Sequence, residues 1–600
     1  MNTRRRFLMT APMAVIGAAV ACRRGPQSAA PSTPASTPGA PPTFASAPEF
    51  GPPVSTSTFA EAEKLAQVTM TGADREMAAA TWRRSMAPLL ERRVGPKTVA
   101  IPADVAPATR WNPMLTPTPV PTRDQFVRSQ TGGAALPSND ADIAFAPVTQ
   151  LSRWIERKEL TSVRLTNIYL KRIEQFDSRL RCIITLTREH ALSRAAAADA
   201  EIAAGKYRGP LHGVPYGVKD LLDTAGIPTT YGAEPFRNRV PNTDSTVVQR
   251  LNAAGGVLLA KLSLGALALN DIWFGGQTMN PWLLEEGASG SSAGPGAATA
   301  AGLVAFSIGS ETGGSIIAPA MRCGVTGLRP TFGRVPRTGA MALCWSLDKL
   351  GPMTRSVEDA MLVLREISGV DSGDVSSVPS HLEFDAGASV TGLRVGYFPA
   401  WMQENPATDV DRAALDTVRK LGMTAKEATL PDWPYGSLQH VLFSEAAASF
   451  EDLTLSGGLR SLKAQVPDAW PNLFREARFL SAVDFVQADR FRRRVAGEMA
   501  RIFSEVDLLL VPSLRDEMLT IGNFTGHPTL TLRAGFVNVS EARSDWAPDP
   551  QNPLPKFSTP RRVPHGVTLM GRLFDEGTVA RAGLALERAF AVSGERPPGF

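Results

Sequence analysis

One stretch after residue 160 has the apolar spacing of an amphipathic helix. Its apolar positions recur every three or four residues, at Leu165, Ile168, Tyr169, Ile173 and Phe176. Thr161 or Ser162 is placed to cap its start. The next stretch, "TREHALSRAAAADAEIAAG", is expected to form a second helix that Gly205 ends. The pattern therefore predicts two consecutive helices near the start of the main body.

Short apolar runs follow these helices and alternate with helix-like segments. Three of them read "GVPYGVKD", "GGVLLAKL" and "GLVAFSIGS". Apolar runs without polar alternation are typical of strands that are buried on both faces. Strands interleaved with helices over several hundred residues predict an α/β fold, with a sheet covered by helices on both faces.

The N-terminus has the layout of a secretory signal over residues 1–21. It has a charged start, an apolar stretch from Ala11 to Val20 and small residues at its end, where a signal peptidase would cleave. The apolar stretch is too short to span a bilayer as a permanent helix. The string "TRRRFL" resembles the twin-arginine export signal. We therefore expect the chain to be exported to the periplasm, free or tethered to the membrane.

Two processing routes for this signal remain open from the sequence. "AVA" before Cys22 fits a signal-peptidase site, and the same residues resemble a lipoprotein box that would lipidate Cys22 and tether the protein to the membrane. Residues 22–58 are rich in Pro, Ala and Ser and predict an extended linker. Residues 59–135 form an N-terminal extension, helical and then Pro-rich, that we expect to pack on a main domain at 136–600.

Composition and charge exclude several classes of protein and site. The 600 residues are 43% hydrophobic and 20% charged, which indicates a globular chain. A net charge of +5 gives no argument for nucleic-acid binding, and the run Arg492–Arg494 is interpreted as a solvated helix face. Apart from Cys22, three cysteines remain without framework spacing, and the six histidines are scattered. We expect no disulfide scaffold, no metal site and no cofactor.

Three places in the main body could carry chemistry. In "HGVPYGVKD", Lys219 shares a strand face with Gly217, although a lysine at a strand end often reaches solvent. In "GASGSSAG", Ser291 and Ser292 sit in a small-residue turn, where serines also act as helix caps. In "GSETGGSIIAP", the glycine turn before Ser315 presents N–H groups that could hold an anion or an oxyanion. Each motif alone is ambiguous.

Taken together, these motifs resemble the amidase signature family. The resemblance runs through "PLHGVPYGVKDLLDTAGIPTTYG", "GSSAG", "GSETGGSIIAPAMRCGVTGLRPTFGRV" and "SLDKLGPMTRSVEDA", and it covers roughly residues 140 to 595. The 24 residues from Ser291 to Ser315 match the separation of the family's two catalytic serines. The resemblance implies an α/β/α fold around a central mixed sheet, and an enzyme that cleaves amides without a cofactor.

The resemblance also implies roles for individual residues. Ser315 corresponds to the acyl-forming nucleophile, Ser291 to a bridging serine after a cis peptide bond, and Lys219 to the base. The oxyanion hole corresponds to the backbone N–H groups around Thr312, Gly313, Gly314 and Ser315. A lysine titrates near 10.4 in water, so it accepts a proton at neutral pH only when burial lowers its pKa. We therefore expect Lys219 to be buried, neutral and within hydrogen-bond reach of Ser291.

The sequence departs from the family pattern on both sides of the nucleophile. Glu311 stands where the family has an aspartate, and Ile317 stands where it has an arginine. Arg322 is our hypothesis for a substitute partner of Glu311. The substrate pocket is expected from residues 395–505 and 540–560. Three tryptophans could line it or pack in the core, namely Trp345, Trp401 and Trp433.

Three functions follow from these observations. The first is an exported amidase that hydrolyses a small amide. The second is the A subunit of a tRNA-dependent amidotransferase, which the resemblance includes and which works in the cytosol with ATP, charged tRNA and partner subunits. The third is an exported binding relative that does not turn over its ligand, which the changes at Glu311 and Ile317 suggest.

Overall fold

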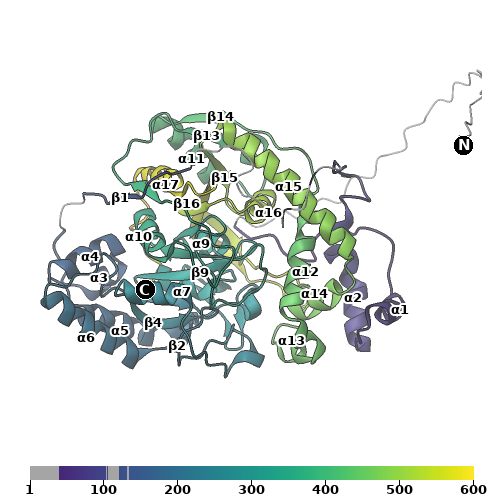
Figure 1. Cartoon of the computed structure of the whole chain (residues 1–600), viewed down its shortest axis with the longest axis horizontal. Coiled ribbons are helices and arrows are strands. Elements are labelled where there is room, and N and C mark those ends of the chain that lie inside the picture. Colours follow the sequence, from purple (N-terminus) through teal and green to yellow (C-terminus); the bar gives the residue numbers. More distant parts are fainter. Residues whose placement is uncertain (1–38, 103–104, 106–107, 109–119, 131–133) are drawn as a thin grey trace, which may run out of the picture. The chain divides into compact units, whose positions relative to one another are not determined.

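An 11-stranded mixed β-sheet runs through the computed structural model (Figure 1), which describes residues 39–102, 105, 108, 120–130 and 134–600. The sheet order is β14-β13-β15-β17-β16-β10-β11-β9-β3-β4-β2. In chain order its strands are β2 (Ile183–Leu186), β3 (Pro215–Lys219), β4 (Val257–Leu262), β9 (Phe306–Glu311), β10 (Thr326–Arg329), β11 (Lys349–Thr354), β13 (Arg394–Tyr397), β14 (Thr424–Glu427), β15 (Leu508–Pro512), β16 (Thr529–Glu541) and β17 (Lys556–Gly571).

Helices connect these strands and pack on them. The helices of the main body are α3 (Asp140–Phe145), α4 (Val148–Glu156), α5 (Ser162–Leu180), α6 (Arg188–Ala203), α7 (Thr246–Ala253), α8 (Ala293–Ala300), α9 (Ile317–Cys323), α10 (Val357–Ile367), α11 (Asp409–Lys420), α12 (Gln439–Ser449), α13 (Glu451–Leu455), α14 (Trp470–Ala477), α15 (Ala482–Glu505), α16 (Asp516–Thr525) and α17 (Glu576–Phe590). The predicted α/β class is confirmed by this architecture.

Helices cover both faces of the sheet, as the sequence predicts. A Cβ added at Gly583 of α17 would lie 2.4 Å from Leu530, and one at Gly327 would lie 2.7 Å from Ala320 of α9. Leu530 pairs across the strands with Leu328, whose side chain points away from the face of its neighbour Gly327. α17 and α9 therefore pack on opposite faces of the sheet.

The two helices predicted from apolar spacing are confirmed. α5 spans Ser162–Leu180, and the side chain of Thr161 accepts a hydrogen bond from Arg164 N at 3.1 Å at its start. α6 ends at Ala203, and Gly205 adopts a φ of +80°, the left-handed conformation that glycine takes most readily. The three apolar runs are β3, β4 and β9, which are buried along their whole lengths.

The strand directions bring the predicted site to one edge of the sheet. β3 lies between β4 and β9 and is parallel to both. Lys219 is the last residue of β3, and the turn that carries Ser315 follows Glu311, the last residue of β9. Because neighbouring parallel strands end at the same edge, the lysine and the glycine turn come close together.

The N-terminal extension packs on the main domain, as predicted. It contains α1 (Thr56–Ala66) and α2 (Gly72–Ser85), and α2 lies against α14 (Figure 1). Thr81 Oγ1 donates to Glu476 at 2.6 Å, and Arg475 pairs with Asp74 at 3.0 Å. Over the described residues there are also three two-stranded sheets: β1 (Gln125–Val127) with β12 (Glu383–Asp385), β5 (Ile272–Trp273) with β6 (Gly276–Gln277), and β7 (Met279–Asn280) with β8 (Leu283–Gly287).

Two sequence interpretations change in the structure. Arg492 does not lie on a solvated face: it is buried, pairs with Asp489 at 2.8 Å and donates to Ser346 at 3.0 Å, because this side of α15 packs inward. Residues from Gly39 onward, which the sequence assigns to an extended linker, contact the main domain.

The expected signal at 1–21 and Cys22 lie outside the described residues. Within the described part of the chain, no helix has the length and apolar character needed to cross a membrane.

Candidate active site

Lys219 lies in a buried cluster of serines at the end of β3. Its side chain has no exposed surface, and its Nζ lies 2.8 Å from Ser291 Oγ, 3.1 Å from Ser292 Oγ and 2.9 Å from Ser310 Oγ. Burial lowers the pKa of Lys219 well below its ordinary value, against the opposing effect of the Asp348 and Glu311 carboxylates. The predicted burial and the predicted contact with Ser291 are both confirmed.

The loop that carries Ser291 is held tightly at its backbone. The Gly290–Ser291 peptide bond is cis, as the family resemblance implies. A side chain at Gly290 would place its Cβ 1.7 Å from the carbonyl oxygen of Asn270, so only glycine fits this approach. Gly290 N and Ser289 Oγ both donate to Asp545, at 2.7 and 2.8 Å. These contacts fix the position of the Ser291 hydroxyl next to Lys219.

Ser315 follows a glycine turn that opens onto a cavity. Gly314 has a φ of +136°, which disfavours other residues, and a Cβ at Gly313 would meet no atom within 4 Å. Within the described residues, the N–H groups of Gly313, Gly314 and Ser315 donate to no protein acceptor. Thr312 at the start of the turn donates its hydroxyl to Asp348 at 2.6 Å. The turn therefore offers unoccupied N–H donors beside a partly exposed serine.

The two serine segments are joined through the backbone. Ser292 N donates to the carbonyl oxygen of Ser315 at 3.1 Å. No hydrogen bond of the Ser315 hydroxyl is found within the described part of the chain, and Ser315 lines the cavity beside Gly290. Contacts between a nucleophile and its base are often long in the absence of substrate. The structure thus brings all three predicted catalytic positions to one place.

Glu311 supports the Ser315 turn through a buried network. One carboxylate oxygen accepts from Ile316 N at 2.7 Å and Ile317 N at 2.9 Å, and the other accepts from Arg329 at 2.6 Å and Asn523 at 2.9 Å. Burial raises the pKa of Glu311, but Arg329 and the N–H donors outweigh it and hold the pKa below its ordinary value. The carboxylate therefore stays charged and anchors the turn.

The partner that the sequence analysis assigns to Glu311 is wrong. Arg322 pairs with Asp545 at 3.2 Å, whereas Glu311 is paired by Arg329 of β10. Arg329 lies 18 residues away along the chain, and β10 is separated from β9 by β11 in the sheet. The pairing depends on sheet order, which the sequence pattern alone does not give.

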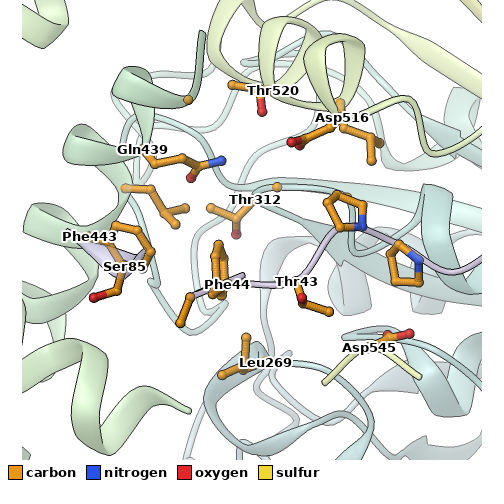
Figure 2. Close-up of a pocket in the computed structure, with 18 of the residues that line it drawn as sticks. Thr43, Phe44, Ser85, Leu269, Thr312, Gln439, Phe443, Asp516, Thr520 and Asp545 are labelled. Atoms are coloured by element: carbon orange, nitrogen blue, oxygen red, sulfur yellow. The ribbon is translucent and has the colours of Figure 1, made fainter. Parts of the chain in front are cut away.

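A cavity of about 320 Å³ lies over Ser315. As expected, part of its wall comes from residues 395–505 and 540–560, including Gln439, Phe443 and Asp545 (Figure 2). Trp470 also lines it. Other parts of the cavity wall are not predicted from the sequence. The stretch 41–47 and residues near the end of α2 also line the cavity. These segments precede the family resemblance, so no motif pointed to them.

The three tryptophans considered for the pocket do not line this cavity. Trp345 is half exposed, whereas Trp401 and Trp433 are partly buried and pack against the core. Among the described residues, no group of three or more His, Cys, Asp or Glu side chains is placed to hold a metal ion. The chemistry offered at this site is that of a buried amine, two serines and backbone N–H donors.

Comparison with known proteins gives the same family over most of the chain. Residues 164–580 match the Amidase family. The AmiD protein of Mycobacterium bovis is 36% identical over 479 residues, which cover 78% of this chain and 98% of that protein. The glutamyl-tRNA(Gln) amidotransferase A subunit of Anaeromyxobacter dehalogenans is 34% identical over 465 residues, which cover 72% and 94%.

Solved structures agree with the sequence comparison. The native peptide amidase of Stenotrophomonas maltophilia superimposes with a TM-score of 0.65 at 28% identity, covering 76% of this chain and 98% of that one. The matched regions include β3, the Ser291 loop and the Ser315 turn, since all lie within residues 164–580. The chain belongs to the amidase family, the amidase signature enzymes, and is an amide-hydrolysing enzyme.

Proposed function

We propose that the protein hydrolyses a small carboxylic amide through an acyl-enzyme on Ser315. The observation that carries the proposal is the buried Lys219 amine 2.8 Å from Ser291 Oγ, next to the open Ser315 turn. A serine hydroxyl is a weak nucleophile and needs an adjacent base, and a buried neutral amine supplies one. Ser291 is proposed to relay the proton between Ser315 and Lys219.

The hydrogen bonds around Lys219 support its role as a neutral base. A neutral amine has two N–H donors and one lone pair. Ser292 gives its own proton to the carbonyl of Ser310 at 3.1 Å, so its oxygen accepts from Lys219, as Ser310 Oγ also does. In the proposed neutral state, the lone pair is then left to accept from the Ser291 hydroxyl, whose Oγ lies 2.8 Å from Lys219 Nζ. This arrangement points the basic electron pair at the serine that would relay the proton.

In the first half of the proposed reaction, Ser315 Oγ forms a bond to the amide carbon. Its proton passes to Ser291, whose own proton passes to Lys219. The oxyanion lies at the N–H groups of Gly313, Gly314 and Ser315, and Thr312 is held in place by Asp348. Return of the proton to the leaving nitrogen breaks the C–N bond and releases ammonia or an amine.

In the second half, water replaces the amine. The water oxygen bonds to the acyl carbon while one water proton passes through Ser291 to Lys219. The tetrahedral intermediate then collapses with cleavage of the Ser315 ester bond. The carboxylic acid leaves and Ser315 regains its proton. The net reaction is amide plus water giving acid plus amine, and no cofactor enters the balance.

A fluorophosphonate tests the proposed nucleophile directly. Such a reagent forms a bond from serine Oγ to phosphorus and expels fluoride. We expect the wild type to be labelled once per chain and the Ser315→Ala variant to remain unlabelled. Ser513→Ala is a matched control, because this buried serine directly after β15 is hydrogen-bonded to Thr568 at 2.8 Å. Folded wild type that stays unlabelled would favour a binding protein without turnover.

We also propose that the enzyme is exported by the twin-arginine route and retained in the cell envelope. The basic start, the apolar stretch and the small-residue exit before Cys22 support this location. The native protein would start at Cys22, with the mass of an attached lipid if the lipoprotein route is used. Mass spectrometry of the N-terminal peptide from fractionated cells distinguishes the two forms. A native N-terminus at Met1 in the cytosol contradicts export.

The similarity to amidotransferase A subunits favours a second candidate function. In that case the amide would be glutamine, and the released ammonia would pass to a partner protein. The N-terminal signal weighs against it, because that role needs charged tRNA and ATP in the cytosol. Glutamine hydrolysis that rises on addition of amidotransferase partner subunits would support this candidate. Amide turnover by the isolated chain supports the first.

A further inference from the structure

The stretch Pro41–Ala47, here called the strap, lies on the catalytic cavity. Pro41, Pro42, Thr43, Phe44 and Ala45 line the same cavity as the Ser315 turn. Figure 2 shows Thr43 and Phe44 on this cavity together with Thr312. The strap lies more than a hundred residues before the region that matches the Amidase family, so it is an addition to the common catalytic body.

The N-terminal end of the strap is tied to the machinery that holds Ser291. The carbonyl oxygen of Gly39 accepts from Arg322 at 3.3 Å. The same guanidinium group pairs with Asp545 at 3.2 Å, and Asp545 accepts from Gly290 N at 2.7 Å. Gly39, Arg322 and Asp545 are all buried. One buried arginine therefore connects the strap to the loop of the bridging serine.

The C-terminal end of the strap is tied to α2. Phe50 N donates to the carbonyl oxygen of Arg83 at 2.8 Å. Glu49 pairs with Arg84 at 3.1 Å and also with Arg83. With both ends held and two successive prolines fixing its backbone φ, the strap has little freedom to leave the cavity.

Phe44 is the strap residue with aromatic partners in the cavity wall. Its ring lies 5.2 Å from that of Phe443 and 6.1 Å from that of Trp470, measured between ring centroids. Both partners line the cavity as well. Aromatic pairs of this geometry attract each other beyond the burial of their area. The ring thus occupies a defined position in the space available to a substrate.

We infer that the strap is a specificity-determining wall, and that Phe44 restricts the enzyme to amides with a compact apolar group. The inference rests on the proposed function, because it concerns the substrate of the Ser315 site. A cavity of about 320 Å³ is at the small end of the range for ligand sites. The strap occupies space that a longer substrate would need, and Phe44, Phe443 and Trp470 present an aromatic surface to the group that remains.

The test compares how fast Ser315 reacts with a compact and a bulky fluorophosphonate. Diisopropyl fluorophosphate is the compact probe, and a fluorophosphonate with a biphenyl group is the bulky one. We expect Phe44→Ala to raise the bulky-to-compact rate ratio at least tenfold. Phe44→Trp should lower the ratio. Phe44→Leu replaces the alanine variant if that variant does not accumulate as folded protein.

The matched control is Phe59→Ala. Phe59 lies in α1 of the neighbouring N-terminal extension and packs against Trp82 and Phe479, with ring centroids 5.7 and 5.3 Å apart, but it does not line the cavity. It should leave the rate ratio unchanged. An unchanged ratio in the Phe44 variants, with Ser315 still labelled, overturns the role of the strap alone. Wild type that reacts with neither probe overturns the proposed function and the inference with it.

Discussion

The protonation state of Lys219 gives a prediction that can be worked to a magnitude. The perturbation is a change of pH between 5 and 9. A lysine with its ordinary pKa near 10.4 would be neutral in only about one molecule in a thousand near pH 7.4. The reactivity of Ser315 would then rise about tenfold per pH unit, or about a hundredfold from pH 7 to 9. Burial instead holds the pKa of Lys219 well below that value.

We therefore expect the base form to be present already at neutral pH. The sign follows from the direction of the shift: a lowered pKa keeps the amine neutral as pH falls from 10.4, and protonation removes the base only below the native pKa. The rate of labelling by a neutral fluorophosphonate should rise far less than a hundredfold from pH 7 to 9, with its steep limb at lower pH. A full tenfold rise per unit up to pH 9 would refute a neutral Lys219.

Variants connect this profile to Lys219. Lys219→Met keeps the length and apolar stem of the side chain but removes the amine, and should reduce labelling by a factor on the order of 10³ or more. The residual labelling rate of this variant should no longer show the steep rise with pH that the wild type shows at low pH. Lys206→Met changes an exposed lysine and serves as the control. It should reproduce the wild-type profile.

Two further predictions concern the supports of the site. Glu311→Ala leaves the buried Arg329 without its carboxylate, and should lower the free energy of unfolding by about 3–5 kcal/mol; denaturant titration checks this, and an unchanged midpoint contradicts the anchoring role. Gly290→Ala pushes a Cβ against the Asn270 carbonyl, and should slow labelling about a hundredfold. Gly497→Ala is its control, because a Cβ on this exposed face of α15 meets nothing within 4 Å; equal rates for both glycine variants would contradict the tight fit.

Local signals and one family motif were sufficient to predict α5, the buried strand that ends in Lys219 and the contact of Lys219 with Ser291. The helical spacing of the apolar residues and the capping position of Thr161 predict α5. The apolar run that leads to Lys219 predicts a buried strand. The spacing of Ser291 and Ser315 in the family pattern then placed both beside that lysine, which the structure bears out for the contact with Ser291. These features are short-range, or are carried by a motif of fixed spacing.

Features that depend on tertiary packing were not predictable in the same way. Arg329 reaches Glu311 only because of the order of the strands in the sheet, and Arg492 is buried only because of how α15 packs. Ser292 and Ser310 are not predicted as partners of Lys219, although each lies within one of the motifs, "GASGSSAG" and "GSETGGSIIAP". The position of the strap on the cavity is not predicted, because a Pro- and Ala-rich composition indicates a linker. No local pattern shows that the Phe44 ring packs against two aromatic rings of the main domain.

The central claim is that an amide is cleaved through an ester on Ser315. The most direct measurement stops turnover of an aryl amide with acid and maps the protein by mass spectrometry. The account predicts that the acyl group is found on the peptide that contains Ser315, and that it disappears after the substrate is exhausted. Turnover with no acylated peptide, or with the acyl group on another residue, would contradict it.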